Sequence, residues 1–154
     1  MNKLYVLVGV PGSGKTTWVQ NQTWKQDCVI VSTDDFVEAY AKERGLTYSD
    51  VFDAYMPHAV QLMADKVVRA RIGRKDIIWD QTSTTIKSRA RKFNMLHDYY
   101  AIAVVFKTPE PEELARRLAS RPGKNIPEEV ITQMINNWEE PSLEEGFQEI
   151  WYAG

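Results

Sequence analysis

The chain has 154 residues, of which 44% are apolar and 26% are charged, as in a soluble globular protein, so we expect residues 1–154 to form a single domain. A formal net charge of −2 argues against a general polyanion binder. The single cysteine, Cys28, excludes an internal disulfide, and no apolar stretch is long enough to span a membrane. Because no signal peptide precedes the first apolar run, we expect a cytoplasmic protein with no membrane partner, and the composition leaves its oligomeric state open.

The first predicted elements are a strand, Lys3–Val8, and a helix, Lys15–Gln22, which flank the sequence G-x-x-x-x-G-K-[ST] of a phosphate-binding P-loop. Glycines let consecutive backbone N–H groups point inward, and the following helix adds its partial positive charge. We expect Lys15 to reach the β- and γ-phosphates of a nucleoside triphosphate, and the Thr16 hydroxyl to bind Mg²⁺. The alternative, a turn without a ligand, is disfavoured by the lysine and threonine in register. The loop residues expected to bind the nucleotide are Gly12, Ser13, Gly14, Lys15, Thr16 and Thr17.

Strand-type runs alternate with helical runs along the rest of the chain, which predicts an α/β fold, a parallel sheet with helices on both faces. The further predicted strands are Cys28–Ser32, Asp76–Trp79, Ala101–Lys107 and Glu149–Tyr152. The further predicted helices are Asp35–Arg44, Ser49–Arg71, Ile86–His97, Pro111–Ala119 and Pro127–Trp138, with Gly45 and Gly73 as C-caps. An apolar stripe in the last helix is expected to lie in the core: Val130, Ile131, Met134, Ile135 and Trp138.

Ligands of such sheets bind beyond the carboxyl ends of the strands, so residues that follow each strand are functional candidates. Asp34 and Asp35 follow the second predicted strand. A phosphoryl acceptor needs its hydroxyl oriented and its proton accepted, and an aspartate can do both. Aspartate is also a common helix N-cap, which is the alternative for this pair. We interpret Asp34 as the general base and Asp35 as a cap or an orienting group at the substrate.

Asp80 ends the third predicted strand, in the position of the Walker B aspartate that holds Mg²⁺ directly or through water. It is therefore a candidate metal ligand and substrate contact, and a capped turn is the alternative. The next helix carries the basic residues Lys87, Arg89, Arg91 and Lys92. Such a run is usually a solvated face, but beside an acceptor site it could follow a phosphodiester backbone. Arg89 is our candidate for that substrate contact.

The helix predicted at Pro111–Ala119 breaks at a Pro-Gly pair before the last helix begins. Arg117 and Arg121 lie four residues apart and therefore project from one helix face or from its end. An arginine-bearing segment between two helices is typical of a lid that closes over a triphosphate and offsets charge in the transition state. The alternative is surface ion pairing with Glu112 and Glu113. We expect Arg117 and Arg121 to contact the nucleotide, with Arg121 in a catalytic role.

Taken together, these motifs resemble the kinase domain of bacteriophage polynucleotide kinase and related P-loop kinases, a group that includes zeta-toxin-like proteins. The residues that carry the resemblance are Gly9–Trp18, Asp34-Asp35-Phe36, Asp80-Gln81-Thr82, Arg117, Arg121 and Lys124–Pro127. It covers nearly the whole chain, and this ordered combination is more specific than the P-loop by itself. The resemblance implies a P-loop kinase fold and transfer of the γ-phosphate of ATP to the 5′-hydroxyl of DNA or RNA. ATP and Mg²⁺ are thus the implied cofactors, and a nucleic acid 5′ end is the implied partner.

Roles follow from the resemblance residue by residue. It implies that Lys15 and Thr16 hold the donor phosphates and Mg²⁺. Asp34 would be the general base, Arg121 the transition-state arginine of the lid, and Arg117 a nearby nucleotide contact. Asp80 matches the aspartate after the third strand.

One departure concerns the acceptor, because Val37 stands where the resembled enzyme has an arginine for the acceptor's 3′-side phosphate. The alternative acceptors are a nucleoside, a hydroxymethylated DNA base, a sugar, an aminoglycoside or a sugar nucleotide. A nucleotide-dependent switch is a further alternative, but a double aspartate with an arginine lid fits a hydroxyl acceptor better. We find no phosphatase motif and therefore expect no removal of 3′-phosphates.

Overall fold

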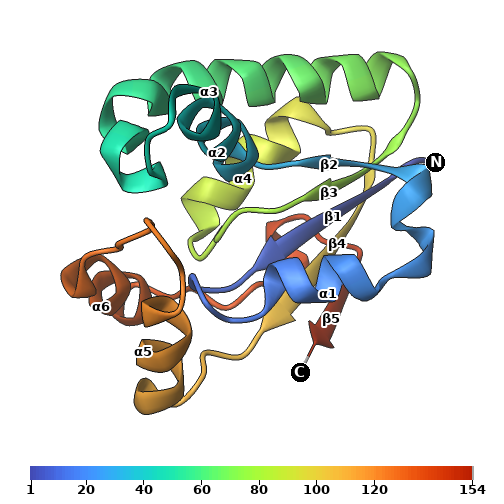
Figure 1. Ribbon diagram of the computed structural model, residues 1–154. Coiled ribbons are helices and arrows are strands. Elements are labelled where there is room, and N and C mark those ends of the chain that lie inside the picture. Colours follow the sequence, from blue (N-terminus) through green and yellow to red (C-terminus); the bar gives the residue numbers. More distant parts are fainter. Residues whose placement is uncertain (154) are drawn as a thin grey trace.

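Five parallel strands form the central sheet of the computed structural model, which describes residues 1–153 (Figure 1). The strands are β1 (Lys3–Val8), β2 (Cys28–Val31), β3 (Asp76–Trp79), β4 (Tyr100–Phe106) and β5 (Glu149–Ala153). Their order is β2-β3-β1-β4-β5, so the strand that leads into the P-loop lies at the centre and pairs with β3 and β4. The predicted α/β class with a parallel sheet is confirmed.

Helices cover both faces of this sheet (Figure 1). They are α1 (Lys15–Asn21), α2 (Thr33–Arg44), α3 (Tyr48–Ile72), α4 (Ile86–Met95), α5 (Pro111–Ala119) and α6 (Glu128–Asn136), with 3₁₀ turns at Thr23–Asp27 and Leu143–Glu145. Successive side chains of a strand point to opposite faces, so β1 contributes to two cores. Leu4 and Val6 pack with residues of α3, whereas Tyr5 and Leu7 pack with Val19 of α1. None of the helices within residues 1–153 has both the length and the apolar character needed to cross a membrane.

The start of α2 differs from the prediction. The helix begins at Thr33 with Ser32 as its N-cap residue, so Asp34 and Asp35 both lie in its first turn. The expected N-cap role of Asp35 is therefore wrong. Serine is as favourable at this position as aspartate, and the positive end of the helix stabilises carboxylates in the first turn. The other predicted elements match the observed ones or differ from them by at most two residues at an end, which is within the spread of assignment methods.

Helix α6 buries fewer side chains than predicted. Ile131 is buried and packs with Val10 of the P-loop and Leu114 of α5. Val130 and Ile135, however, are 38% and 42% exposed, so the expectation that both lie in the core is wrong. The reason is that α6 packs on a short helix and a loop instead of on the sheet, and only one side of it finds apolar partners.

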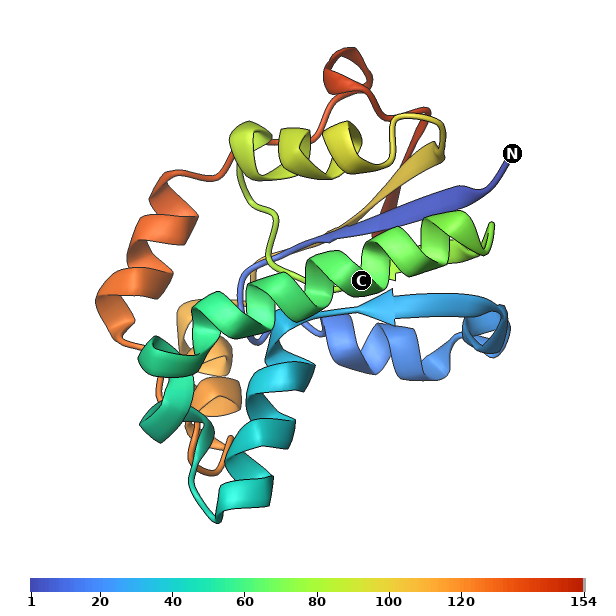
Figure 2. The ribbon, with the colours of Figure 1, turned by 90° about the horizontal axis from the view of Figure 1, so that it is seen from above.

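Helices α5 and α6 and the loop 120–127 between them make up the region that contains the predicted lid, and we call this region the lid. Figure 2 shows it in orange at the end of the sheet where β1, β2 and β3 terminate, beside the α2–α3 hairpin. The lid loop is hydrogen-bonded to the start of α3, since the Ser49 amide donates to the Gly123 carbonyl over 3.0 Å. The fold therefore brings the P-loop, the first turn of α2 and the lid together around one space.

Candidate active site

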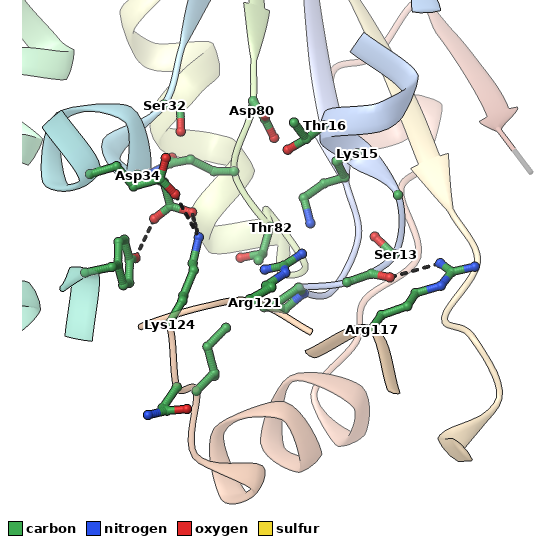
Figure 3. Close-up of a pocket in the computed structure, with 18 of the residues that line it drawn as sticks. Ser13, Lys15, Thr16, Ser32, Asp34, Asp80, Thr82, Arg117, Arg121 and Lys124 are labelled. Atoms are coloured by element: carbon green, nitrogen blue, oxygen red, sulfur yellow. Dashed lines mark hydrogen bonds and ion pairs between the residues drawn. The ribbon is translucent and has the colours of Figure 1, made fainter. Parts of the chain in front are cut away.

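A cleft of about 1960 Å³ opens at the carboxyl ends of the strands, between the P-loop, the α2–α3 hairpin and the lid (Figure 3). A typical small-molecule pocket has roughly 300–1,000 Å³, so this cleft has room for two substrates. All but one of the predicted site residues line it, namely Gly12, Ser13, Gly14, Lys15, Thr16, Thr17, Asp34, Asp35, Asp80, Arg117 and Arg121. The exception is Arg89.

The P-loop has the backbone that its glycines predict. Gly12 and Gly14 adopt φ of +85° and +102°, in the region where a side chain would be strained. At Gly9 the constraint is space, because a Cβ there would overlap the Ser13 hydroxyl oxygen and lie 3.0 Å from the Cβ of Phe106. That oxygen is buried and has no hydrogen-bond partner among the described residues. A buried hydroxyl that is free to donate, in a loop whose glycines let the backbone N–H groups point inward, fits a site that binds phosphate oxygens.

Lys15 and Asp80 have strongly perturbed pKa values. Burial lowers the pKa of Lys15 to about 8 and raises the pKa of Asp80 to about 6, and the attraction between the two groups opposes both shifts. The Lys15 ammonium donates to the carbonyls of Gly9 and Val10 over 2.8 and 2.9 Å. Figure 3 shows the Thr16 hydroxyl pointing toward Asp80. Perturbed acids and bases that share a cleft are typical of a functional site.

Asp34 is held between two donors that the sequence did not point to. The Tyr48 hydroxyl donates to its Oδ1 over 2.6 Å, and the Lys124 ammonium lies 3.0 Å from its Oδ2. Tyr48 comes from the start of α3 and Lys124 from the lid loop, so three separate segments meet at this carboxylate. Figure 3 shows Lys124 reaching Asp34. Neither residue stands next to a strand end, and the only sequence signal was that Lys124 lies in a stretch carrying the family resemblance.

The two lid arginines have different environments. Arg117 donates to Glu113 over 2.8 Å and to the Gly12 carbonyl over 3.0 Å, so it ties α5 to the P-loop. Arg121 points into the cleft near Thr82 (Figure 3) and makes no side-chain hydrogen bond or ion pair within residues 1–153. Its positive charge contributes to lowering the pKa of Lys15, so it lies close to the P-loop lysine.

Residues 4–141 of the chain match the AAA domain family, AAA_33. The chain belongs to this family. Its parallel sheet and P-loop form a P-loop kinase fold. A curated relative, heterogeneous nuclear ribonucleoprotein U-like protein 2 of Mus musculus, is 25% identical over 163 residues, covering 98% of this chain and 21% of that protein. The chain thus spans about a fifth of the length of the curated relatives it matches.

Solved structures share the fold of this AAA-domain chain. A protein from Chloroflexus aurantiacus J-10-fl, described as a candidate kinase, has a TM-score of 0.72 at 16% identity, covering 99% of this chain and 84% of its own. A chain of the Pnkp1/Rnl/Hen1 complex is 27% identical with a TM-score of 0.52, covering 75% of this chain and 38% of its own. A fungal RNA kinase covers 99% and 74% of the two chains at 16% identity, with a TM-score of 0.58. A gluconokinase from Sinorhizobium meliloti 1021 covers 97% and 81% at 15% identity, with a TM-score of 0.57.

Arg89 lies outside the cleft in the structure. The prediction that Arg89 contacts the substrate, which rested on the basic run of α4, is therefore wrong. The Arg89 side chain is fully buried, and its guanidinium pairs with Glu145 over 2.6 Å. It also donates to the carbonyls of Ser83 and Glu139, each over 2.9 Å. Through these bonds the guanidinium joins α4 to the segment that precedes it, at Ser83, and to the segment that follows α6, at Glu139 and Glu145. Arg89 is therefore a structural residue, and the spacing of charges along α4 gave no sign of a partner 56 residues away.

Proposed function

We propose that this protein is an ATP- and Mg²⁺-dependent polynucleotide 5′-hydroxyl kinase, which moves the γ-phosphate of ATP to the 5′-hydroxyl of DNA or RNA. The observation that carries the proposal is that Asp34 and the P-loop lysine Lys15 line one cleft, with the guanidinium of Arg121 also pointing into it. An acid, a phosphate cradle and a cation around a two-substrate space are the parts that phosphoryl transfer to a hydroxyl requires.

The donor side is formed by the P-loop. Its inward N–H groups, the Ser13 hydroxyl and the Lys15 ammonium would bind the phosphates of ATP. Thr16 and Asp80 offer the hydroxyl and carboxylate oxygens that Mg²⁺ prefers and would hold the ion, which would supply positive charge that offsets the charge of the donor phosphates. Arg121 stabilises the charge that develops on the transferred group.

The acceptor side is formed by the first turn of α2. The acceptor hydroxyl donates its hydrogen bond to Asp34, which orients the oxygen toward the γ-phosphorus and takes its proton. The new oxygen–phosphorus bond forms as the bond to the bridging β–γ oxygen breaks, and ADP leaves. The adjacent Asp35 lines the same wall of the cleft and helps to orient the acceptor.

Likeness to other proteins supports a nucleic acid acceptor. The 27% identical chain belongs to a complex named for Pnkp1, and one structure with the same fold is named as an RNA kinase. The resemblance of the ordered motifs to bacteriophage polynucleotide kinase points the same way. These names belong to the other proteins, and the likeness of this chain to those proteins supports the proposal.

A second candidate function is phosphorylation of a small hydroxylated compound. Val37 is fully buried between α2 and α3, so its side chain cannot contact a phosphate of the acceptor. The charged residues of these two helices that line the cleft are Asp34, Asp35, Glu38, Lys42 and Asp53, an acidic surplus that disfavours polyanions. One structure of the same fold is named as a gluconokinase.

An acceptor panel with ATP labelled at the γ-phosphate tests the proposal. The panel contains DNA and RNA oligonucleotides with free 5′-hydroxyls, nucleosides, hydroxymethylated DNA and sugars. Label transfer to the oligonucleotides supports the proposed function, and transfer only to small compounds selects the second candidate. Absence of transfer to every hydroxyl, under conditions where the protein binds ATP, refutes both.

The role of Asp34 is tested by Asp34→Asn. A general base contributes roughly 10²–10⁴-fold, so we expect kcat to fall by at least about 100-fold. The affinity for ATP, measured by calorimetry, should change less than about twofold, because the amide keeps the shape of the side chain. Asp65→Asn, at an exposed position of α3, is the matched control and should behave as the original protein. Retention of activity in Asp34→Asn would remove Asp34 from the role of base.

A further inference from the structure

The lid loop carries a second cation, Lys124, that does not face the donor side. Its ammonium lies 3.0 Å from Asp34 and 3.5 Å from Glu38, and 4.4 Å from the centre of the Tyr48 ring. The Lys124 side chain is only 13% exposed. A lysine with two carboxylates and an aromatic face around it is fixed in place, unlike most lysines of a surface loop.

Backbone contacts decide whether Lys124 reaches this position. On one side of it the Gly123 carbonyl accepts from the Ser49 amide over 3.0 Å, and on the other side the Asn125 amide donates to the Ser49 hydroxyl over 2.8 Å. Gly123 has φ of +69°, and a Cβ there would lie 2.8 Å from the Cβ of Thr47. The loop therefore docks closely on the start of α3, and Lys124 contacts Asp34 only when it is docked.

The contacts of Asp34 leave room for a substrate. Its Oδ1 accepts from Tyr48 and its Oδ2 from Lys124, so each oxygen uses one of its two lone-pair directions. One direction on each oxygen remains for an acceptor hydroxyl. The Asp34 side chain is 45% exposed and would otherwise rotate, and two donors from different segments hold its carboxylate in one plane.

We infer that Lys124 is a positioning residue that couples docking of the lid to the orientation of Asp34. This inference rests on the proposed function, in which Asp34 is the base. Lys124 follows Arg121 by three residues, so a single movement of the loop delivers the arginine to the phosphates and the lysine to the base. The acceptor side is then complete only when the donor side is covered, and transfer to an acceptor is tied to the docked lid.

The kinetic test uses Lys124→Met, with Lys87→Met on the exposed face of α4 as the matched control. With the best acceptor of the panel, we expect Lys124→Met to lower kcat by roughly tenfold or more and to change KM for ATP less than twofold. Lys124→Arg should recover part of the loss because it also donates to a carboxylate. Tyr48→Phe combined with Lys124→Met should cost less than the product of the single effects, since both hold the same carboxylate. An unchanged kcat in Lys124→Met, or fully multiplicative effects in the double variant, would overturn the inference.

A second test does not depend on catalysis. Trypsin cleaves after Lys124 but not at Arg121, which precedes proline, so cleavage at Lys124 reports undocking of the loop. We expect cleavage there to be several-fold faster in Asp34→Asn than in Asp65→Asn. Equal rates would show that Asp34 and the loop are not coupled, whatever the enzyme phosphorylates. Absence of transfer by the original protein, in contrast, refutes the proposed function and would appear before any variant is made.

Discussion

Replacement of the buried Arg89 by methionine should strongly destabilise the protein without altering its chemistry. The guanidinium is fully buried, and its partner Glu145 is only 6% exposed. In Arg89→Met the Glu145 carboxylate stays in the interior without a counter-charge, and the carbonyls of Ser83 and Glu139 lose a donor. The loss is therefore dominated by an uncompensated buried charge and not by the volume of the side chain.

The magnitude follows from this geometry. Removal of one partner of a buried ion pair costs about 3–5 kcal/mol of the free energy of unfolding. A domain of this size has about 5–15 kcal/mol in total, so the variant keeps a fold but a marginal one. At about 2–4 °C per kcal/mol, Tm should fall by about 6–20 °C.

Urea unfolding and calorimetry of Arg89→Met, with Arg91→Met from the exposed face of α4 as the control, measure this loss. The double variant Arg89→Met/Glu145→Leu removes the lone charge as well and should regain at least half of the loss, since an apolar pair can replace a buried ion pair. At a temperature where the single variant is folded, kcat/KM should equal that of the original protein. A loss under about 1 kcal/mol, or no recovery in the double variant, would refute the account of the pair. A selective loss of acceptor affinity would instead return Arg89 to the substrate site.

Three further predictions concern single side chains. Gly9→Ala should weaken ATP binding by about tenfold or more in calorimetry, because the new methyl would lie 3.0 Å from the Cβ of Phe106 and would force the Ser13 hydroxyl out of its position in the P-loop. Unchanged affinity contradicts the tight fit. The profile of kcat/KM for ATP against pH should fall below about pH 6, where Asp80 gains a proton, and above about pH 8, where Lys15 loses its charge. A profile that is flat across either limit contradicts the role of that residue in the donor site. Lys92→Met should raise the free energy of unfolding at pH 7 by about 1–2 kcal/mol, because burial lowers the pKa of this lysine to about 8 and its charged form is destabilised below that pH. Loss of the contacts of its ammonium with the Ser88 carbonyl and the Trp79 ring offsets part of the gain. A loss of stability in urea would contradict this prediction.

Local signals made the donor side predictable from the sequence. The P-loop motif spans eight consecutive positions, Gly9–Thr16, so its backbone and its lysine are specified without reference to the rest of the chain. Asp34 and Asp80 were predictable because the carboxyl ends of neighbouring parallel strands share one edge of the sheet. In the structure β2 pairs with β3, so Asp34, in the first turn of the helix after β2, and Asp80, directly after β3, lie beyond the ends of adjacent strands.

Features that depend on distant partners could not be predicted. Arg89 belongs to a run of charges that indicates a solvated face, and only the fold shows that Glu145 reaches it. Tyr48 and Lys124 converge on Asp34 because the lid loop docks on α3, and no periodicity encodes that contact. The prediction of the N-cap of α2 was wrong for a simpler reason. Serine and aspartate are equally good N-caps, and both residue types stand at the start of this helix.

The shared apolar cluster of Val10, Leu114 and Ile131 limits how this protein can open. Detaching both lid helices would return three buried aliphatic side chains to water, at about 1.5–3 kcal/mol each, so such a state would be populated at roughly one part in 10³ to 10⁶. The loop 120–127 is held by hydrogen bonds to Ser49, by the ion pairs of Lys124 and by the apolar side chain of Ile126. Because such partly exposed polar contacts are individually weak, the loop can lift at a smaller cost. We therefore expect substrates to enter and leave by movement of the loop 120–127 alone. The helices α5 and α6 would stay packed on Val10, so the P-loop keeps its position while the loop moves.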